Sequence, residues 1–331
     1  MDATTGAVKL GPFSSLLSDN KTLDPGALNV ELDIPVAPFG APGGQGDGGA
    51  FVRLWGIPLN WIGQATNLNG LRCQVYAGMS KGLPLANPAQ QGLLVDGIIF
   101  QAFANWVGTD MTLDLNLIAP VGTIDTPKSH ILYWKAGTTL SDAIKQCLTQ
   151  TYPGYTVNIN ISENLVLPYD ETGFYPTLSE FTNVVSGLAT SIISNSGNRA
   201  YGGISISLKG KTFTVVDTTN QPSPKQIAFT DFMGQPTWVG LNEIQMYLVM
   251  RGDLSISDFI KMPTTPSGQG VLAYTQASSF SALKNQSIFQ GTFLITQIRH
   301  VGNFRSPQGT NWITTVNAVT LGTNPDEATT E

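Results

Sequence analysis

The sequence predicts a mainly β protein in which two small β-barrels flank an α+β middle domain that contains the helices. Three observations favour this fold. Short alternating apolar segments fill both ends of the chain, helix-type spacing occurs only between them, and 331 residues allow two or three domains at about 150 residues each. The charged fraction of 12% is about half the ~25% usual in soluble domains. So much uncharged surface indicates large shared interfaces.

The first β-barrel domain is predicted over residues 26–127, after a polar N-terminal extension over 1–25. Alternation over 28–36 predicts a strand that buries one face, formed by Leu28, Val30, Leu32 and Ile34. The Gly- and Pro-rich stretch that follows, 38–49, predicts a mobile loop. Further strand patterns cover 51–59, 71–77, 92–100 and 111–119. Strands at this short spacing indicate a small barrel or sandwich.

The α+β middle domain is predicted over 128–225. Thr139 offers an N-cap, and helical spacing follows it at Leu140, Ala143, Ile144, Cys147 and Leu148. A second helix opens with a capping box from Thr177 to Glu180 and carries one apolar stripe, formed by Leu178, Phe181, Val184, Val185 and Leu188. A strand over 156–161 separates the helices, and the segments 204–208 and 212–216 form a hairpin.

The second β-barrel domain is predicted over 226–322, followed by an acidic tail over 323–331. Its strand patterns cover 243–250, 258–262, 271–275, 291–301 and 311–319.

Charge and cysteine content exclude several classes of function. The net charge of −6 and the lack of any Lys/Arg run argue against sequence-specific nucleic-acid binding and against stable membrane association. The N-terminus has no apolar core of a signal peptide, and no stretch of about 18 apolar residues occurs. Cys73 and Cys147 are predicted to be buried free thiols of a protein from a reduced compartment.

Catalytic chemistry has few candidates, and we expect no enzyme, no metal site and no cofactor. His130 and His300 are the chain's two histidines; hydrogen-bonded structural roles, at a domain boundary and at a strand end, are favoured over proton transfer. Histidine and cysteine spacing does not fit a zinc site. The glycines of 40–49 lack the Gly-Lys-Ser/Thr ending of a phosphate loop and precede a strand, which favours a flexible loop.

Two further features have structural interpretations that outweigh the functional ones. Asp110 and Asp114 are a carboxylate pair, but their even spacing in a strand places both on one solvent face. Six tryptophans suggest sugar stacking, yet they are scattered through apolar contexts typical of core or interface anchors: Trp55, Trp61, Trp106, Trp134, Trp238 and Trp312.

The C-terminal stretch carries a recognisable motif, in which the strand 291–301 holds His300, Gly302 follows, and a Trp-x-Thr strand comes next with Trp312 and Thr314. This motif resembles the last barrel of the central baseplate hub proteins of contractile-tailed bacteriophages, the phage late control D-like family. That family is similar to the hub half of type VI secretion spike proteins. The Asp often found after the glycine is Asn303 in this chain.

Several weaker blocks agree in order with the same family, so the resemblance covers about residues 28–320. They are Gly56-Ile-Pro58, Val75-Tyr-Ala-Gly78, Asp96-Gly97-Ile-Ile, the strand from Asp110, Ala136-Gly137-Thr138, the helix from Leu178, and Gly234-Gln-Pro236 with Gly252-Asp253.

The resemblance implies a structural virion protein of the tail baseplate, assembled in the host cytoplasm. Its expected form is a homotrimeric hub that joins the hexameric tail tube to the trimeric central spike and lines the ejection channel. Six similar barrels from three chains match a sixfold tube, and three chains match a threefold spike. Tail tube and spike proteins are the implied partners, with tape measure, baseplate wedge and sheath-initiator proteins as further ones. Spike and lysin are expected to be separate proteins.

Two alternatives stay open from the sequence. One is a β-rich carbohydrate-binding module or secreted hydrolase, which needs an aromatic platform and a secretion route. The other is a different tail component, namely a tube, distal-ring or spike protein. The helix-bearing insert between two β regions favours the hub.

Overall fold

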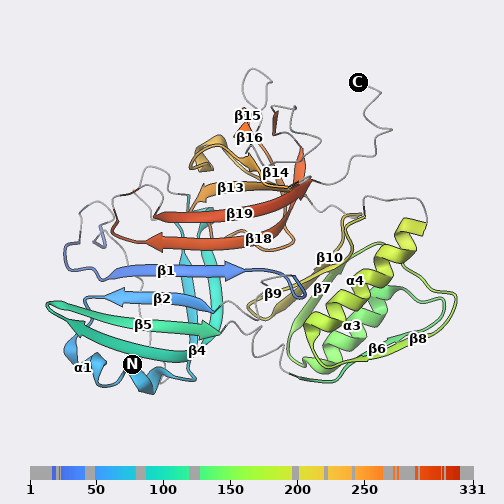
Figure 1. Cartoon of the computed structure of the whole chain (residues 1–331), viewed down its shortest axis with the longest axis horizontal. Coiled ribbons are helices and arrows are strands. Elements are labelled where there is room, and N and C mark those ends of the chain that lie inside the picture. The colour runs from blue at the N-terminus through green and yellow to red at the C-terminus, as the bar shows by residue number, and fades with distance from the viewer. Residues whose placement is uncertain are drawn as a thin grey trace.

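The computed structural model describes residues 17–19, 22, 24–41, 49–79, 87–118, 127–195, 201–219, 223–240, 243–263, 271–272, 274–275, 288–289, 291–306, 308 and 311–320. For residues 194–195 and the short strands within 271–289 it describes only the backbone. The protein is mainly β with few helices (Figure 1). The predicted acidic tail 323–331 lies outside the described residues.

One large sheet dominates the molecule. Its twelve strands follow a main path of β16 (Tyr274–Thr275), β12 (Thr237–Trp238), β13 (Glu243–Val249), β19 (Trp312–Thr320), β18 (Thr292–Asn303), β1 (Asn29–Val36), β2 (Ala50–Trp55), β5 (Asp110–Ile118), β4 (Gly92–Val107) and β3 (Arg72–Ala77). Off this path, β14 (Phe259–Lys261) pairs with β18 and with β11 (Lys225–Gln226). Separately, β15 (Val271–Leu272) pairs with β17 (Ile288–Phe289). The described strands do not close into a barrel, so the two barrels stay a prediction.

The sheet joins the two ends of the chain. We call β1–β5 the first β unit and β11–β19 the second β unit. The two pair antiparallel through β1 and β18, from Glu31 opposite Asn303 to Val36 opposite Ile298. Figure 1 shows this join as the blue β1 beside the red β18. The two β regions predicted as separate barrels therefore share a backbone ladder.

Short helices connect the strands of the first β unit. They are α1 (Leu59–Ile62), η1 (Ala65–Leu68) and η2 (Pro88–Gln90), and a fourth, η3 (Phe229–Asp231), lies in the second β unit. The strand predicted over 51–59 ends at Trp55, because Gly56 turns the chain with φ +81° and Pro58 caps α1. None of the described helices is long and apolar enough to cross a membrane.

The third part, which we call the α/β unit, comprises β6 (His130–Trp134), α3 (Leu140–Thr151), β7 (Thr156–Asn160), β8 (Glu171–Tyr175), α4 (Leu178–Asn195), β9 (Ser205–Lys209) and β10 (Thr212–Val216). β9 and β10 form the predicted hairpin, β10 also pairs parallel with β7, and β6 pairs with β8. Both predicted helices are confirmed. Thr139 caps α3 by accepting a hydrogen bond from the Asp142 N–H.

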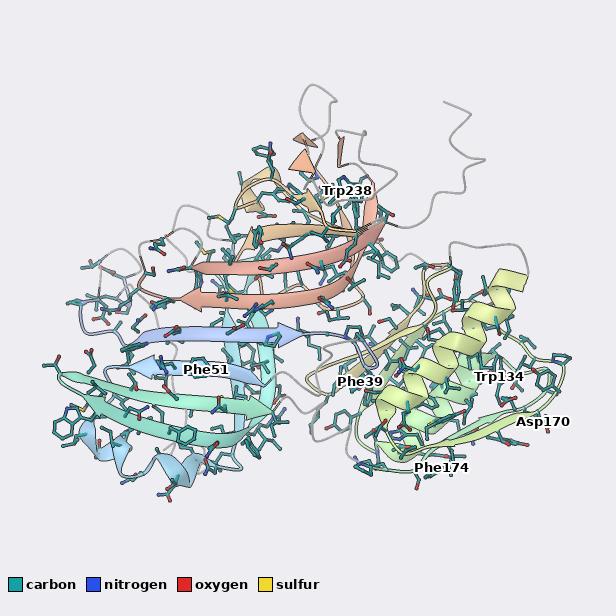
Figure 2. All side chains as sticks on the ribbon, viewed as in Figure 1. Phe39, Phe51, Trp134, Asp170, Phe174 and Trp238 are labelled. Atoms are coloured by element: carbon teal, nitrogen blue, oxygen red, sulfur yellow. The ribbon has the colours of Figure 1, made fainter. Side chains whose placement is uncertain are left out.

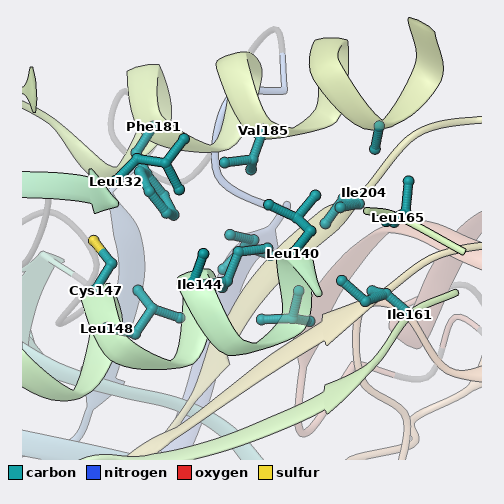
Figure 3. Packing of buried hydrophobic residues seen from close by; sticks show 14 of the residues in the cluster. Leu132, Leu140, Ile144, Cys147, Leu148, Ile161, Leu165, Phe181, Val185 and Ile204 are labelled. Atoms are coloured by element: carbon teal, nitrogen blue, oxygen red, sulfur yellow. The ribbon is translucent and has the colours of Figure 1, made fainter. Parts of the chain in front are cut away.

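The core of the α/β unit lies between its helices and strands (Figure 3). All five apolar residues predicted to face inward from α3 are buried. On α4 the buried residues include Leu178, Phe181 and Val185, while Val184 and Leu188 are partly buried at the edge of the stripe. Separate apolar clusters fill the first and second β units, and Val36 at the end of β1 packs against both. The domain boundaries at 26–127, 128–225 and 226–322 stay a prediction.

Phe39 corrects the prediction of a mobile loop over 38–49. Its side chain is buried in the core of the α/β unit, 6.4 Å from Phe213 between ring centroids, and its N–H donates to the Ile206 carbonyl at 3.0 Å (Figure 2). The start of this segment is therefore an anchor. Residues 42–48 of the segment lie outside the described residues.

Candidate functional site

The face of the large sheet opposite the core runs across both β units and carries charged and polar residues together with Phe51 and Trp55. Along β1 the apolar residues point into the core, so Glu31 and Asp33 point to the opposite side, which we call the outer face. The strand registers place Arg53 and Asp114 of the first β unit on this outer face. The residues of the second β unit on the same face include Arg299, Thr315, Asn317, Gln245 and Tyr247.

Hydrogen bonds and ion pairs connect this outer face across the join. The Arg299 guanidinium donates twice to the Asp33 carboxylate, at 2.7 and 2.6 Å. Farther along, the Gln245 amide donates to Asn317 Oδ1 at 3.1 Å, and the Tyr247 hydroxyl donates to Gln245 Oε1 at 3.0 Å. Such a ladder of cross-strand pairs is typical of a rigid, solvated sheet face.

Asp114 corrects one prediction. Only 8% of this residue is exposed, because Arg53 covers it with two hydrogen bonds at 2.7 and 2.8 Å. The hydrogen bonds that Arg53 donates to Asp114 raise the pKa of the Arg53 guanidinium, which also lies over the rings of Phe51 and Trp55. Asp110 is exposed at the start of β5, so the two carboxylates do not share a solvent face as a pair.

An apolar surface is exposed where β4 extends beyond β3. β3 is the last strand of the main path, and it pairs with β4 only as far as Ile98. The later part of β4 exposes Phe100, Phe103, Trp106 and Val107, and Trp106 is 60% exposed. The register places Phe103 on the outer face beside Asp114 and Trp106 on the opposite face beside Met111. We call these four residues the β4 patch. Exposed aromatic side chains on a sheet edge are typical of a protein interface.

A second apolar surface lies on the α/β unit, on the side of the β6–β8 pair that faces away from the helices. It contains Ile131, Tyr133 and Phe174 from the strands, with Ile131 directly opposite Phe174. Figure 2 shows Phe174 at the margin of this unit, away from the large sheet.

The tryptophans divide between core and surface. Trp134 and Trp238 are buried, which agrees with the prediction of core anchors and removes both from any sugar-stacking platform. Trp55, Trp61 and Trp312 are partly buried.

The four residues of the C-terminal motif lie together on the β18–β19 pair. His300 is opposite Thr314, and His300 Nδ1 lies 2.9 Å from Thr314 Oγ1. Gly302 is opposite Trp312, and a Cβ at Gly302 would lie only 2.4 Å from the indole ring. The strand continues past His300 to Asn303, whose side chain accepts a hydrogen bond from the Arg305 N–H at 3.3 Å. Asn303 therefore supplies a turn hydrogen bond in this hairpin.

His130 has the structural contacts that the sequence favours. Its Nδ1 lies 3.1 Å from the Tyr175 carbonyl oxygen and its Nε2 lies 2.6 Å from the Tyr152 hydroxyl. The residue is fully buried and is the first residue of β6.

His300 makes stability depend on pH. Burial, and then the nearby Lys209 charge, lowers the pKa of this imidazole from 6.5 to about 3. The unfolded chain takes up a proton below pH 6.5 while the folded chain does not, so this contribution is complete above pH 6.5 and is lost as the pH falls toward 3. We expect His300→Ala to lower the free energy of unfolding by about 1–3 kcal/mol at pH 7. Urea titrations between pH 7 and pH 4 should show a steeper loss for the wild type; parallel curves would contradict this role.

Both cysteines are free thiols. Cys147 is buried as predicted, whereas Cys73 is half-buried. Burial raises the pKa of each thiol to about 11, so neither is a thiolate nucleophile at neutral pH. The described residues contain no group of three or more His, Cys, Asp or Glu side chains placed to hold a metal ion.

A buried polar network, which the sequence analysis missed, joins the first and second β units. The Arg251 guanidinium donates to Asp231 at 2.9 Å and twice to Asp253, at 3.0 and 2.7 Å. From the first β unit, the Gln90 amide donates to Asp231 at 2.8 Å. These residues come from three separate segments with no motif spacing, so a single sequence offers no signal that would group them.

A close backbone crossing lies next to this network. A Cβ at Gly92 would lie 2.4 Å from the Gly252 oxygen, and a Cβ at Gly252 would lie 2.5 Å from the Gly92 oxygen. Only glycine fits at either position, because both obstacles are backbone atoms. We call the network and this crossing the seam.

Comparison with known proteins gives likeness of structure only. No family model and no curated protein matches the chain. The tail protein from Neisseria meningitidis MC58 matches at 10% identity over 88% of this chain and 91% of its own, with a TM-score of 0.44. The prophage MuSo2 43 kDa tail protein from Shewanella oneidensis matches at 7% identity over 89% and 96%, with a TM-score of 0.45.

A third structure comes from a secretion system. The E. coli c3393 protein, a type VI secretion component described as structurally similar to the T4 tail proteins gp27 and gp5, matches at 9% identity over 88% of this chain and 73% of its own, with a TM-score of 0.45. The chain is thus similar in structure to phage tail proteins and to a component of a type VI secretion system.

Proposed function

We propose that the protein is a structural, non-enzymatic component of a phage tail: a homotrimeric baseplate hub that joins the hexameric tail tube to the trimeric central spike. Its two β units act as the two barrels of the hub, within the boundaries 26–127 and 226–322. The outer face of the large sheet lines the ejection channel. The protein is assembled in the host cytoplasm and resides in the contractile-tail baseplate of the virion.

The observation that carries the proposal is the continuity of the outer face across β1 and β18. A channel wall needs a surface that continues from one unit to the next, and here the Arg299–Asp33 pair bridges the two units at their join. A trimer then supplies three identical walls, each made of two β units, which satisfies sixfold and threefold neighbours at once.

Charge supports passage of DNA through such a channel. The chain has a net charge of −6, so three copies carry −18. The arginines of the outer face, Arg53 and Arg299, are already held by carboxylates. A lumen of this kind repels phosphates and limits their retention during ejection.

The exposed edge of β4 supports assembly of the chain into a ring. The β4 patch exposes aromatic residues, and the part of β4 that carries them is not paired with β3. A neighbouring subunit that covers the patch shields these side chains from water and covers the unpaired strand edge. In this proposal the β units make the ring contacts, and the α/β unit is displaced toward the periphery or the spike side. The tube and spike proteins bind the two ends of the ring, and tape measure, wedge and sheath-initiator proteins are further partners.

Imaging of the assembled tail tests the hub. We expect a ring with threefold symmetry between tube and spike that contains three copies of this chain. Trp106→Glu in the β4 patch should abolish ring formation, because it buries a charge in the interface. The control Tyr169→Glu, at an exposed aromatic residue of the α/β unit, should leave the ring intact. The hub assignment would be wrong if six identical chains formed the ring, or if the β units of the chain in the assembled tail were fully exposed to solvent.

A further inference from the structure

A cavity lies where the three units meet. The β9–β10 hairpin reaches from the α/β unit toward the large sheet (Figure 1) and encloses, with β1, β2, β4, β18 and the segment 254–258, a volume of about 320 Å³. This volume is at the lower end of the range for small-molecule sites, about 300–1,000 Å³. The position of the cavity between units also matches where such sites are usually found.

The hairpin presents its polar side to this cavity. Cross-strand register places Ser207 opposite Thr214 and Lys209 opposite Thr212, and all four line the cavity. Within the described part of the chain, the hydroxyls of Ser207, Thr212 and Thr214 have no hydrogen-bond partner. Three free hydroxyls on one wall form a set of available donors.

His300 supplies a further donor from the opposite wall. The residue is 2% exposed and lines the cavity. Thr314 Oγ1 accepts the Arg251 N–H at 2.9 Å, which leaves its own proton available to His300 Nδ1, also at 2.9 Å. In that tautomer the other ring nitrogen, Nε2, carries the hydrogen, and it has no partner among the described residues.

Lys209 lines the cavity and forms no ion pair with a carboxylate among the described residues. The lining carboxylates are already paired, Asp96 with Arg72 and Asp258 with Lys225. The Lys209 ammonium instead donates to neutral oxygens at 3.0 Å: the carbonyls of Gly252 and Leu254 and the hydroxyl of Ser255. Burial, and then the Lys225 charge, lowers the pKa of Lys209, while the charges of Asp258 and Asp253 oppose this shift.

We propose that this junction cavity binds a small oxyanion, held by the Lys209 charge, His300 Nε2–H and the hydroxyls of the β9–β10 hairpin. At about 30 Å³ per water molecule, the cavity has room for a phosphate-sized group with several waters. Val36, Leu94 and Ile298 form apolar walls that suit a short carbon body. The bound anion connects the units, because its ligands belong to the α/β unit and the second β unit. Residues of the first β unit form the remaining wall of the cavity.

Inorganic phosphate is the probe that tests this site. We expect phosphate to raise the Tm of the full chain above its value in sodium chloride of equal ionic strength, because it binds the folded state selectively. The double variant Thr212→Val and Thr214→Val keeps the shape of the hairpin but removes two donors, and should weaken binding by calorimetry about tenfold or more. Lys211→Met is the matched control: it removes a cation from the exposed hairpin turn outside the cavity and should keep binding within about twofold.

Three outcomes overturn the proposal. They are equal Tm values in phosphate and chloride, equal loss of binding in the Lys211 control and the double variant, and a crystal structure from phosphate in which the cavity contains water only. The site does not depend on the hub assignment, so either proposal can fail while the other stands.

Discussion

Replacing Phe181 by alanine is expected to lower the free energy of unfolding by about 3–5 kcal/mol, the usual cost of a large cavity in a packed core. The side chain is fully buried on α4, with its ring 6.2 Å from His130 and 6.0 Å from Tyr175 between centroids. Equilibrium unfolding in urea, followed by far-ultraviolet circular dichroism, measures the loss.

Phe174→Ala is the matched control for this experiment. It makes the same chemical change in the same unit, but Phe174 is 62% exposed and belongs to no core cluster. We expect a change within about 0.5 kcal/mol. Similar losses for the two variants would mean that α4 does not bury its Phe181 face as described.

Arg251→Met is expected to lower the free energy of unfolding by about 3–5 kcal/mol, because it leaves the buried carboxylate of Asp231 without its cation. The Arg251 side chain is 4% exposed and that of Asp231 is 8% exposed, so water replaces the lost contact poorly. Methionine keeps most of the side-chain volume, which limits any additional cavity cost. Urea unfolding again measures the effect.

Arg299→Met distinguishes burial from ion pairing as such. Arg299 also donates twice to a carboxylate, but its side chain is 58% exposed on the outer face. An exposed pair contributes about 1 kcal/mol or less. If both arginine variants lost the same stability, the seam would not be the desolvated network that the distances indicate.

Elements whose signals are local were predictable from the sequence. The α3 helix has an N-cap at Thr139 and an apolar stripe in the correct period, and both features depend only on neighbouring residues. Likewise, alternation along β1 and β5 identified their buried faces, because a strand with one face in the core must repeat every second residue.

Elements that depend on distant partners were not predictable. Nothing near Phe39 in the sequence reveals that its ring belongs to the core of another unit. Asp114 has the spacing of an exposed residue, and only the position of Arg53 on the adjacent strand accounts for its burial. The same reason applies to the junction cavity, whose walls come from every unit. The motif around His300 identified a hairpin, but the free Nε2 could be recognised only with β9 and β10 in place.

The pairing of β1 with β18 also determines when the chain can finish folding. Asp33 and Arg299, which bond across this join, are 266 positions apart in the sequence. During synthesis the ribosome therefore releases β1 long before its second neighbour exists, and β1 has one open edge throughout that interval. Contacts of such long range slow folding and prolong exposure of unpaired strands to other nascent chains. Completion of the large sheet thus waits for the synthesis of β18, and a chain that stops before residue 292 has lost the strand that closes β1.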